Sequence, residues 1–421
     1  MGSRLWVLGC GLWVVGCGWG TDAAYHAAVP AHPASTGTSG HNPEDDGLEL
    51  AASAPLVTDL NLEDLEHEAR RAIGEMAYAY YAGGADDERL LEGNVAAWAH
   101  WQLHPRVLAG IDEVSTATTV LGTPVSSPVV VAPTAIQGLA HADGEVATAR
   151  GAAAVGALMI LSSLATCPLE DVAAAAPEGP RWMQVYILRE RARTVELVRR
   201  AAAHGYRALV LTVDAPVSGL RLREWRLGVH LPDDLALPNL AGDSTSSARE
   251  GGFMAVVTHE FEPALTPDDI EWLAGLSALP VVVKGVQRSD DAVRCVEAGA
   301  AAVVVSNHGA RQLADAPATA DILPEVVDAV GGRAEVYVDG GVRRSADVVK
   351  ALALGARATL VGRPSLWALA AGGTEGVAGL LDWYETELRR AMALCGAKTV
   401  ADIDRSLVRR TPGWALEGPL L

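Results

Sequence analysis

Short apolar runs alternate with helical patterns along most of this chain, and this rhythm constrains the fold more than any other feature. The runs are rich in Val, Ala, Leu and Ile, and helical segments separate nearly all of them. Strands this uniformly apolar are typical of a parallel sheet whose two faces are both buried. Eight such units over about 250 residues predict a (β/α)8 TIM barrel. A doubly wound sheet, which would bind its ligand at one switch point, is the alternative. The eight expected strands are 129–135, 158–163, 181–187, 208–214, 280–285, 301–309, 334–341 and 358–364.

Three further segments lie outside this rhythm. Apolar residues at helical spacing predict a helix from Leu62 to Tyr80, with Gly83 and Gly84 ending it. Residues 217–265, between the fourth and fifth runs, are rich in Gly, Pro and Asp, and an insertion of this length is typical of a substrate loop or lid. Residues 1–55 are expected to be a disordered or signal-like extension with a weak lipoprotein-like segment, and residues 56–421 the barrel domain.

Composition excludes several classes of protein. Of the 421 residues, 50% are hydrophobic, so a large core can form, and the net charge of −19 disfavours nucleic-acid binding. Five cysteines without a CxxC pair predict neither a disulfide framework nor a zinc site. No apolar segment predicts a stable membrane span. We therefore expect a cytoplasmic enzyme that acts on a small molecule and holds no metal.

The carboxyl ends of the expected strands gather the polar residues that can carry chemistry. In a (β/α)8 barrel these ends meet on one face, where the active site is built. One polar strand end would mean little, but eight in register predict a site. The ends and the residues that follow them supply Pro133, Thr134, Ala135, Ser163, Gln184, Tyr186, Thr212, Asp214, Lys284, Ser306, His308, Asp339, Gly340, Gly341, Arg343, Gly362 and Arg363.

A base and a carboxylate clamp can be assigned among these residues. His308 and Asp214 end different strands, and a carboxylate that orients an imidazole is a common way to make a working base. Arg311 and Arg221 could clamp one substrate carboxylate from two sides, because guanidinium groups match carboxylate geometry. Tyr80 adds a hydroxyl group from the N-terminal helix.

The last two strand ends predict a phosphate site. Gly340, Gly341 and Gly362 let the backbone approach closely, and Arg343 and Arg363 supply charge. Lys284 has two interpretations: it could form a Schiff base, or it could place a positive charge beside a cofactor ring that becomes anionic on reduction.

These residues resemble the signatures of a known family, the FMN-dependent (S)-2-hydroxy acid oxidases and dehydrogenases, which include glycolate and lactate oxidases. The resemblance covers roughly residues 57–410. Its motifs occur in order as YYAGG at 80–84, APTA at 132–135, LTVD at 211–214, VKG at 283–285, SNHGARQ at 306–312, DGGVR at 339–343 and GRP at 362–364.

The resemblance implies a role for each matching residue. His308 with Asp214 would be the catalytic base, Arg311, Arg221 and Tyr80 would bind the substrate carboxylate, and Tyr186 would bond near the substrate hydroxyl. Lys284 would stabilise reduced FMN. The flavin ring would contact Pro133, Thr134, Ala135, Ser163, Gln184, Thr212 and Ser306; the ribityl chain and phosphate would contact Asp339, Gly340, Gly341, Arg343, Gly362 and Arg363.

The resemblance also implies the reaction. It is oxidation of a small (S)-2-hydroxy acid to the 2-oxo acid, with O2 as acceptor giving H2O2, in a homo-tetramer. A quinone or protein acceptor is an alternative, and so is a flavin-free Schiff-base lyase on Lys284. Leu164 stands where glycolate oxidase has Trp, which leaves room for a longer aliphatic or aryl substrate. Ala314 stands where the family commonly has Asp, which motivates a third hypothesis, a flavin protein without catalysis.

Overall fold

A computed structural model describes residues 62–229, 232, 236–240 and 259–411. The expected extension at residues 1–55 lies outside the described residues, as does part of the expected loop at 217–265. No helix among the described residues is long and apolar enough to cross a membrane.

Eight parallel strands close into a barrel, which confirms the predicted TIM barrel and excludes the doubly wound sheet. The order around the ring is β10-β11-β4-β5-β6-β7-β8-β9. The strands are β4 (Val129–Val131), β5 (Met159–Leu161), β6 (Arg181–Val185), β7 (Leu209–Thr212), β8 (Val281–Val286), β9 (Ala302–Val305), β10 (Glu335–Val338) and β11 (Ala358–Val361). Most are shorter than the expected runs, because the last residues of those runs have left the ladder and form the loops over the barrel mouth.

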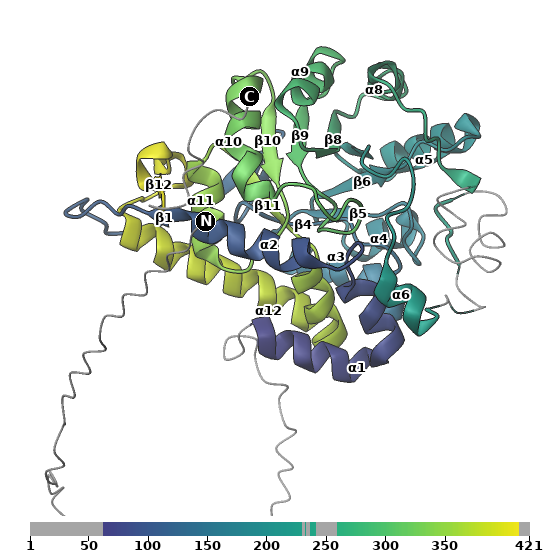
Figure 1. Cartoon of the computed structure of the whole chain (residues 1–421), viewed down its shortest axis with the longest axis horizontal. Helices are drawn as coiled ribbons and strands as arrows, with labels where there is room; N and C mark the ends of the chain where they lie inside the picture. The colour runs from purple at the N-terminus through teal and green to yellow at the C-terminus, as the bar shows by residue number, and fades with distance from the viewer. Residues whose placement is uncertain (1–61, 230–231, 233–235, 241–258, 412–421) are drawn as a thin grey trace, which may run out of the picture. The chain divides into compact units, whose positions relative to one another are not determined.

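Helices surround this ring and follow most of the strands (Figure 1). They are α3 (Gly144–Ala154), α4 (Leu169–Ala175), α5 (Arg191–Ala203), α8 (Pro267–Ala274), α9 (Ser289–Glu297), α10 (Thr319–Val330), α11 (Ser345–Ala353) and α12 (Arg363–Cys395). A short helix, α6 (Leu222–Leu227), occupies the described part of the segment after β7.

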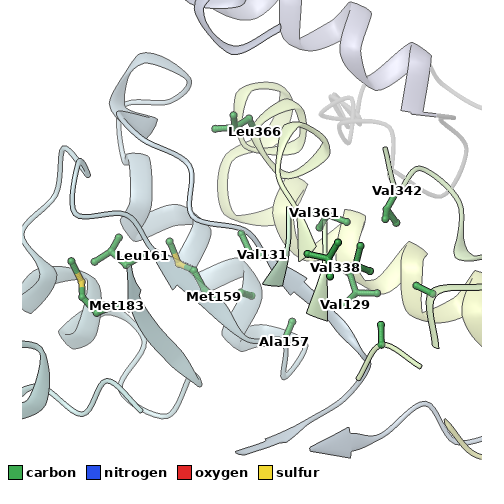
Figure 2. Close-up of a cluster of buried hydrophobic side chains, with 14 of the residues drawn as sticks. Val129, Val131, Ala157, Met159, Leu161, Met183, Val338, Val342, Val361 and Leu366 are labelled. Carbon is green, nitrogen blue, oxygen red and sulfur yellow. The ribbon is translucent and has the colours of Figure 1, made fainter. Parts of the chain in front are cut away.

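Alternate strand residues belong to two separate cores, which explains why the sequence runs are apolar throughout. Val129, Val131, Met159 and Leu161 belong to the core shared with the surrounding helices, and Figure 2 shows these side chains together. Val130 belongs to the second core, inside the barrel. Because both faces of each strand are buried, the strands show no polar alternation.

The N-terminal helix α1 (Leu62–Ala82) packs along α12, as Figure 1 shows. It bends at Gly74, whose φ of 76° is not helical. Tyr78 stacks on Trp367 of α12 at 5.4 Å between ring centroids. The Tyr81 hydroxyl donates to the Ile136 carbonyl at 2.5 Å. These contacts hold the end of α1, and with it Tyr80, over the barrel mouth.

The remaining elements lie outside the barrel ring. Helix α2 (Arg89–Ala97) follows α1, strand β1 (Trp101–Leu103) pairs with β12 (Val408–Arg410), and β2 (Thr118–Val120) forms a hairpin with β3 (Thr123–Val125). Single turns of 3-10 helix occur at Trp98–His100, Gln137–Leu139, Val400–Asp402 and Arg405–Leu407.

Candidate active site

A cavity of about 1160 Å³ lies over the carboxyl ends of the barrel strands. It is large enough for a nucleotide-sized cofactor and a small substrate together. Most of the residues predicted for the site line it: Tyr80, Pro133, Thr134, Ala135, Leu164, Gln184, Tyr186, Thr212, Arg221, Lys284, His308, Arg311, Asp339, Gly340, Gly341, Arg343, Gly362 and Arg363.

Three predicted residues are outside this lining, and each supports one that belongs to it. The backbone N–H and hydroxyl of Ser163 donate to Oε1 of Gln184 at 2.9 and 3.1 Å. The Ser306 hydroxyl accepts from Nζ of Lys284 at 2.8 Å. Asp214, the third, is bonded to His308. The side chains of Ser163 and Ser306 are buried and orient these neighbours.

His308 and Asp214 form the predicted pair. Nδ1 of His308 lies 2.8 Å from Oδ1 of Asp214. Burial would raise the pKa of the Asp214 carboxyl, but the adjacent His308 and then Lys284 outweigh it and hold that pKa below its ordinary value. The charged carboxylate therefore fixes Nδ1 as the protonated nitrogen, which leaves Nε2 of His308 to exchange a proton with a ligand.

The backbone that carries His308 is in an unusual conformation. His308, Gly309 and Ala310 have φ values of 57°, 62° and 64°, in the left-handed region that side chains disfavour. Asn307 holds the start of this turn, because its Oδ1 accepts from the Ala310 N–H at 3.1 Å. Such strain persists at a site only where surrounding contacts over-determine it.

Asn94 of α2 is a site residue that the sequence reasoning missed. Its side-chain amide exchanges two hydrogen bonds with that of Asn307, at 2.9 and 2.8 Å, and both residues are buried. Nothing local in the sequence marks Asn94, since its partner lies 213 positions away. The pair ties helix α2 to the turn that presents His308.

Arg221 and Arg311 both line the cavity, as the predicted carboxylate clamp requires. Burial and the neighbouring charge of Arg221 lower the pKa of Arg311. The Arg311 guanidinium lies over the Tyr80 ring, 5.4 Å from its centroid, and donates to the Tyr80 and Gly83 carbonyls at 2.9 and 2.7 Å. These bonds fix the position of Arg311 in the cavity lining.

Tyr186 stacks on Phe261 with 4.1 Å between ring centroids. Burial, and then the charge of Asp214, raise the pKa of the Tyr186 hydroxyl above its ordinary value. The hydroxyl therefore stays protonated and can donate a hydrogen bond within the cavity. Leu164 is buried and forms an apolar part of the lining.

Lys284 is held as a cation. Its Nζ lies 2.9 Å from Oδ2 of Asp339. Burial would lower the pKa of the ammonium, but the charges of Asp339 and Asp214 outweigh it and raise that pKa. Because only a neutral amine attacks a carbonyl, this environment argues against the Schiff-base interpretation and suits a fixed positive charge.

Two further arginines, Arg343 and Arg363, line the cavity. Arg363 lies beside Arg311, since both guanidinium groups donate to the Gly83 carbonyl, and burial together with the charges of Arg311 and Arg343 lowers the pKa of Arg363 to about 9. The Arg363 guanidinium donates to the carbonyls of Tyr81, Gly83 and Gly309 at 3.0, 2.8 and 2.9 Å. A bound phosphate dianion would relieve this repulsion.

The two glycines of the phosphate loop are required by packing as well. A Cβ on Gly341 would lie 2.1 Å from the Asn94 carbonyl oxygen, and one on Gly340 would lie 2.6 Å from Oγ1 of Thr319. Both have positive φ, at 76° and 95°. The sequence reasoning attributed these glycines to the ligand alone, whereas helices α2 and α10 also press on the loop.

A buried carboxylate, Glu145 of α3, joins the loops that follow β4 and β5, and the sequence reasoning missed it as well. Its Oε1 accepts from the N–H groups of Gln137 and Thr166 at 2.9 and 3.1 Å. Its Oε2 accepts from the Thr166 hydroxyl and the Cys167 N–H at 2.7 and 3.1 Å. Ile136, which directly precedes Gln137, has a φ of 60° in the left-handed region. Glu145 therefore stabilises a strained segment next to Thr134 and Ala135.

FMN fits this cavity by size, charge and hydrogen-bonding capacity. Arg343 and Arg363 suit its phosphate. Oδ1 of Asp339 is buried with no hydrogen-bond partner among the described residues, so it can accept from a ribityl hydroxyl. Lys284 supplies a cation for a ring that becomes anionic. Among the described residues no group of three or more His, Cys, Asp or Glu side chains could hold a metal ion.

Comparison with known proteins agrees with this geometry. The sequence model of the FMN-dependent dehydrogenases matches residues 69–410. Human 2-hydroxyacid oxidase 1 is 45% identical over 83% of this chain and 96% of its own. An L-lactate oxidase of Nostoc is 47% identical over 85% of this chain and 99% of its own. The structure of a mandelate oxidase with (S)-4-hydroxymandelic acid superposes with a TM-score of 0.79 at 42% identity, over 83% of this chain and 98% of that one.

The chain therefore belongs to the FMN-dependent dehydrogenase family, and its cofactor is FMN. It is an oxidoreductase of the 2-hydroxyacid oxidase type, as the resemblance in the sequence predicted. This membership also removes the flavin-free lyase as an alternative.

Proposed function

We propose that this enzyme oxidises an (S)-2-hydroxy acid to the 2-oxo acid and passes the electrons to O2, giving H2O2. The observation that carries the proposal is the His308–Asp214 pair in a cavity that two arginines also line. A base beside a carboxylate clamp suits a substrate whose hydroxyl and carboxylate are on adjacent carbons. The relatives named as 2-hydroxyacid and lactate oxidases support both the substrate class and the acceptor.

The chain's own residues would act as follows. Arg221 and Arg311 bind the carboxylate, and Tyr186 donates to the substrate hydroxyl. His308 accepts a proton from the substrate at Nε2, and Asp214 stabilises the resulting imidazolium. Bound FMN supplies the two-electron acceptor. Lys284, held positive by Asp339, would supply a fixed cation beside the ring of FMN.

We assign the flavin ring to the wall made by Pro133, Thr134, Ala135, Gln184 and Thr212. Asp339, Gly340, Gly341, Arg343, Gly362 and Arg363 are assigned to the ribityl chain and phosphate. Ser163 and Ser306 are assigned to support Gln184 and Lys284. Leu164 makes the substrate side of the cavity apolar, which favours an aliphatic or aryl substituent.

The proposal extends to the whole chain. We assign catalysis to residues 56–421 and treat residues 1–55 as an extension to the barrel. We expect a homo-tetramer in the cytoplasm. Light scattering of the purified protein measures the oligomeric state.

Mixing the aerobic enzyme with a panel of 2-hydroxy acids tests the reaction: H2O2 should appear in a one-to-one ratio with 2-oxo acid. If 2-oxo acid forms only when a quinone is added, the electron acceptor is a quinone and not O2.

A further inference from the structure

Glu224 places a carboxylate of the protein itself between the two clamp arginines. Arg221 directly precedes helix α6, and Glu224 follows it by three residues. Oε1 of Glu224 lies 2.7 Å from Nε of Arg221 and 3.4 Å from Nη2 of Arg311. The side chains of Arg221, Arg311 and Glu224 are only 5%, 16% and 15% exposed, so solvent screens these charges little.

The net charge of Arg221, Arg311 and Glu224 together suits the binding of one carboxylate. Two guanidinium groups and one carboxylate sum to +1. The neighbouring Arg363, which shares the Gly83 carbonyl with Arg311, is assigned to the cofactor phosphate, so a single substrate carboxylate completes the neutrality of the clamp. A second carboxylate on the substrate would add a negative charge close to Glu224 in a poorly screened site, where like charges repel strongly. Without Glu224 the arginine pair would carry +2 and would favour a dianion.

The rest of the substrate side of the cavity agrees with this charge count. Leu164 is 1% exposed and lines the cavity. Tyr186, stacked on Phe261, provides an aromatic surface there. A charged substituent on the substrate would therefore be desolvated against apolar groups, which is costly unless it is paired.

We propose that Glu224 is a specificity-determining residue that restricts the enzyme to 2-hydroxy acids with one carboxylate and an uncharged side chain. This inference rests on the proposed function, because it concerns the choice among 2-hydroxy acids. Glu224 acts by setting the net charge of the arginine pair, and it takes no part in proton transfer.

The test compares (S)-lactate with (S)-malate, which carries one more carboxylate. In Glu224→Gln, which keeps the size of the side chain and removes its charge, the ratio of kcat/KM for malate to that for lactate should rise by about tenfold or more, mainly through a lower KM for malate. Glu170→Gln is the matched control. Glu170 pairs with Arg200, at 31% and 18% exposed, and neither residue lines the cavity, so the same ratio should change by less than about twofold.

Binding without turnover gives a second readout. Succinate and propionate are titrated against the FMN-loaded protein, and their dissociation constants are read from the perturbed flavin spectrum. Glu224→Gln should gain affinity for succinate relative to propionate by a similar factor. An unchanged ratio in both assays, or an equal shift in Glu170→Gln, would overturn the inference while leaving the proposed function intact. If the wild-type enzyme oxidises no 2-hydroxy acid, the proposed function fails, and the titrations still decide the role of Glu224.

Discussion

Nδ1 of His308 lies 2.8 Å from Oδ1 of Asp214, and the two residues follow strands on different parts of the barrel ring, β9 and β7. Gln312 supports the arrangement from the other side, because its Nε2 donates to the Asp214 carbonyl at 2.8 Å. The contact fixes the proton on Nδ1 and turns Nε2 into the acceptor that the proposed reaction needs.

Asp214→Asn should leave FMN bound and lower kcat by about 10²-fold or more, because the neutral amide no longer stabilises the imidazolium.

The same variant tests the lowered pKa of Asp214. A carboxyl whose folded-state pKa is depressed stabilises the fold above its unfolded-state pKa, about 3.9, and loses this contribution as pH falls through the folded-state value. The unfolding free energy of Asp214→Asn should therefore depend less steeply on pH in this acid range. Parallel acid curves for the two proteins would contradict the assigned pKa shift.

Asn94→Ala should slow catalysis without emptying the flavin site. The change leaves the buried amide of Asn307 without its partner and loosens the left-handed turn at His308. We expect kcat to fall by roughly tenfold or more while KM changes little, since misplacement of a base affects the transition state more than ground-state binding. Asn94→Asp, which keeps the acceptor oxygen, should recover part of the loss. A fall confined to thermal stability, with normal kcat, would reduce Asn94 to a structural role.

Glu145→Ala should destabilise the protein strongly. The carboxylate is fully buried and accepts four hydrogen bonds from two loops, so its loss leaves buried donors unsatisfied at a cost of about 3–5 kcal/mol. Glu145→Gln restores only one of the two acceptor oxygens and should recover little. The exposed Glu178→Ala is the control and should change the unfolding free energy by less than about 0.5 kcal/mol in denaturant titrations. Equal stabilities for the two alanine variants would show that the two loops do not depend on Glu145.

Lys284→Met should make the bound flavin harder to reduce. Removing the cation takes away the charge that favours an anionic reduced ring and leaves Asp339 without its ion-pair partner. The midpoint potential of bound FMN should become more negative, and the rate of reduction by substrate should fall. Spectroelectrochemistry on the purified variant measures the potential, and a value equal to that of the wild type would remove Lys284 from this role.

The sequence predicts the barrel well because the local signals are strong. Residues 129–131 and 281–283 are apolar on both faces, a pattern that a sheet buried on both sides requires. Strand ends were predicted too long, because Pro133 to Ala135 and Ser306 to His308 follow apolar runs without a break in sequence but leave the ladder in space. Apolar pattern alone cannot locate the last ladder hydrogen bond.

The site residues also divide into those that the sequence predicts and those that only the structure shows. Lys284 lies near the carboxyl end of β8, and His308 and Arg311 follow β9, so the barrel rule alone brings them together. Asn94 and Glu145 lie on helices and act through partners on distant loops, and no spacing in the sequence marks such pairs. Glu224 carries a weak signal, three residues after Arg221 on a short helix, but only the structure shows that it also reaches Arg311.

The measurement that tests the central claim most directly is anaerobic mixing of the FMN-loaded protein with a panel of 2-hydroxy acids, followed by flavin absorbance. The wild-type flavin should bleach with at least one (S)-2-hydroxy monocarboxylic acid. His308→Ala should retain its FMN and stay oxidised with the same acid. Bleaching of the His308→Ala flavin at the wild-type rate, or no bleaching of the wild-type flavin by any acid of the panel, would contradict the account.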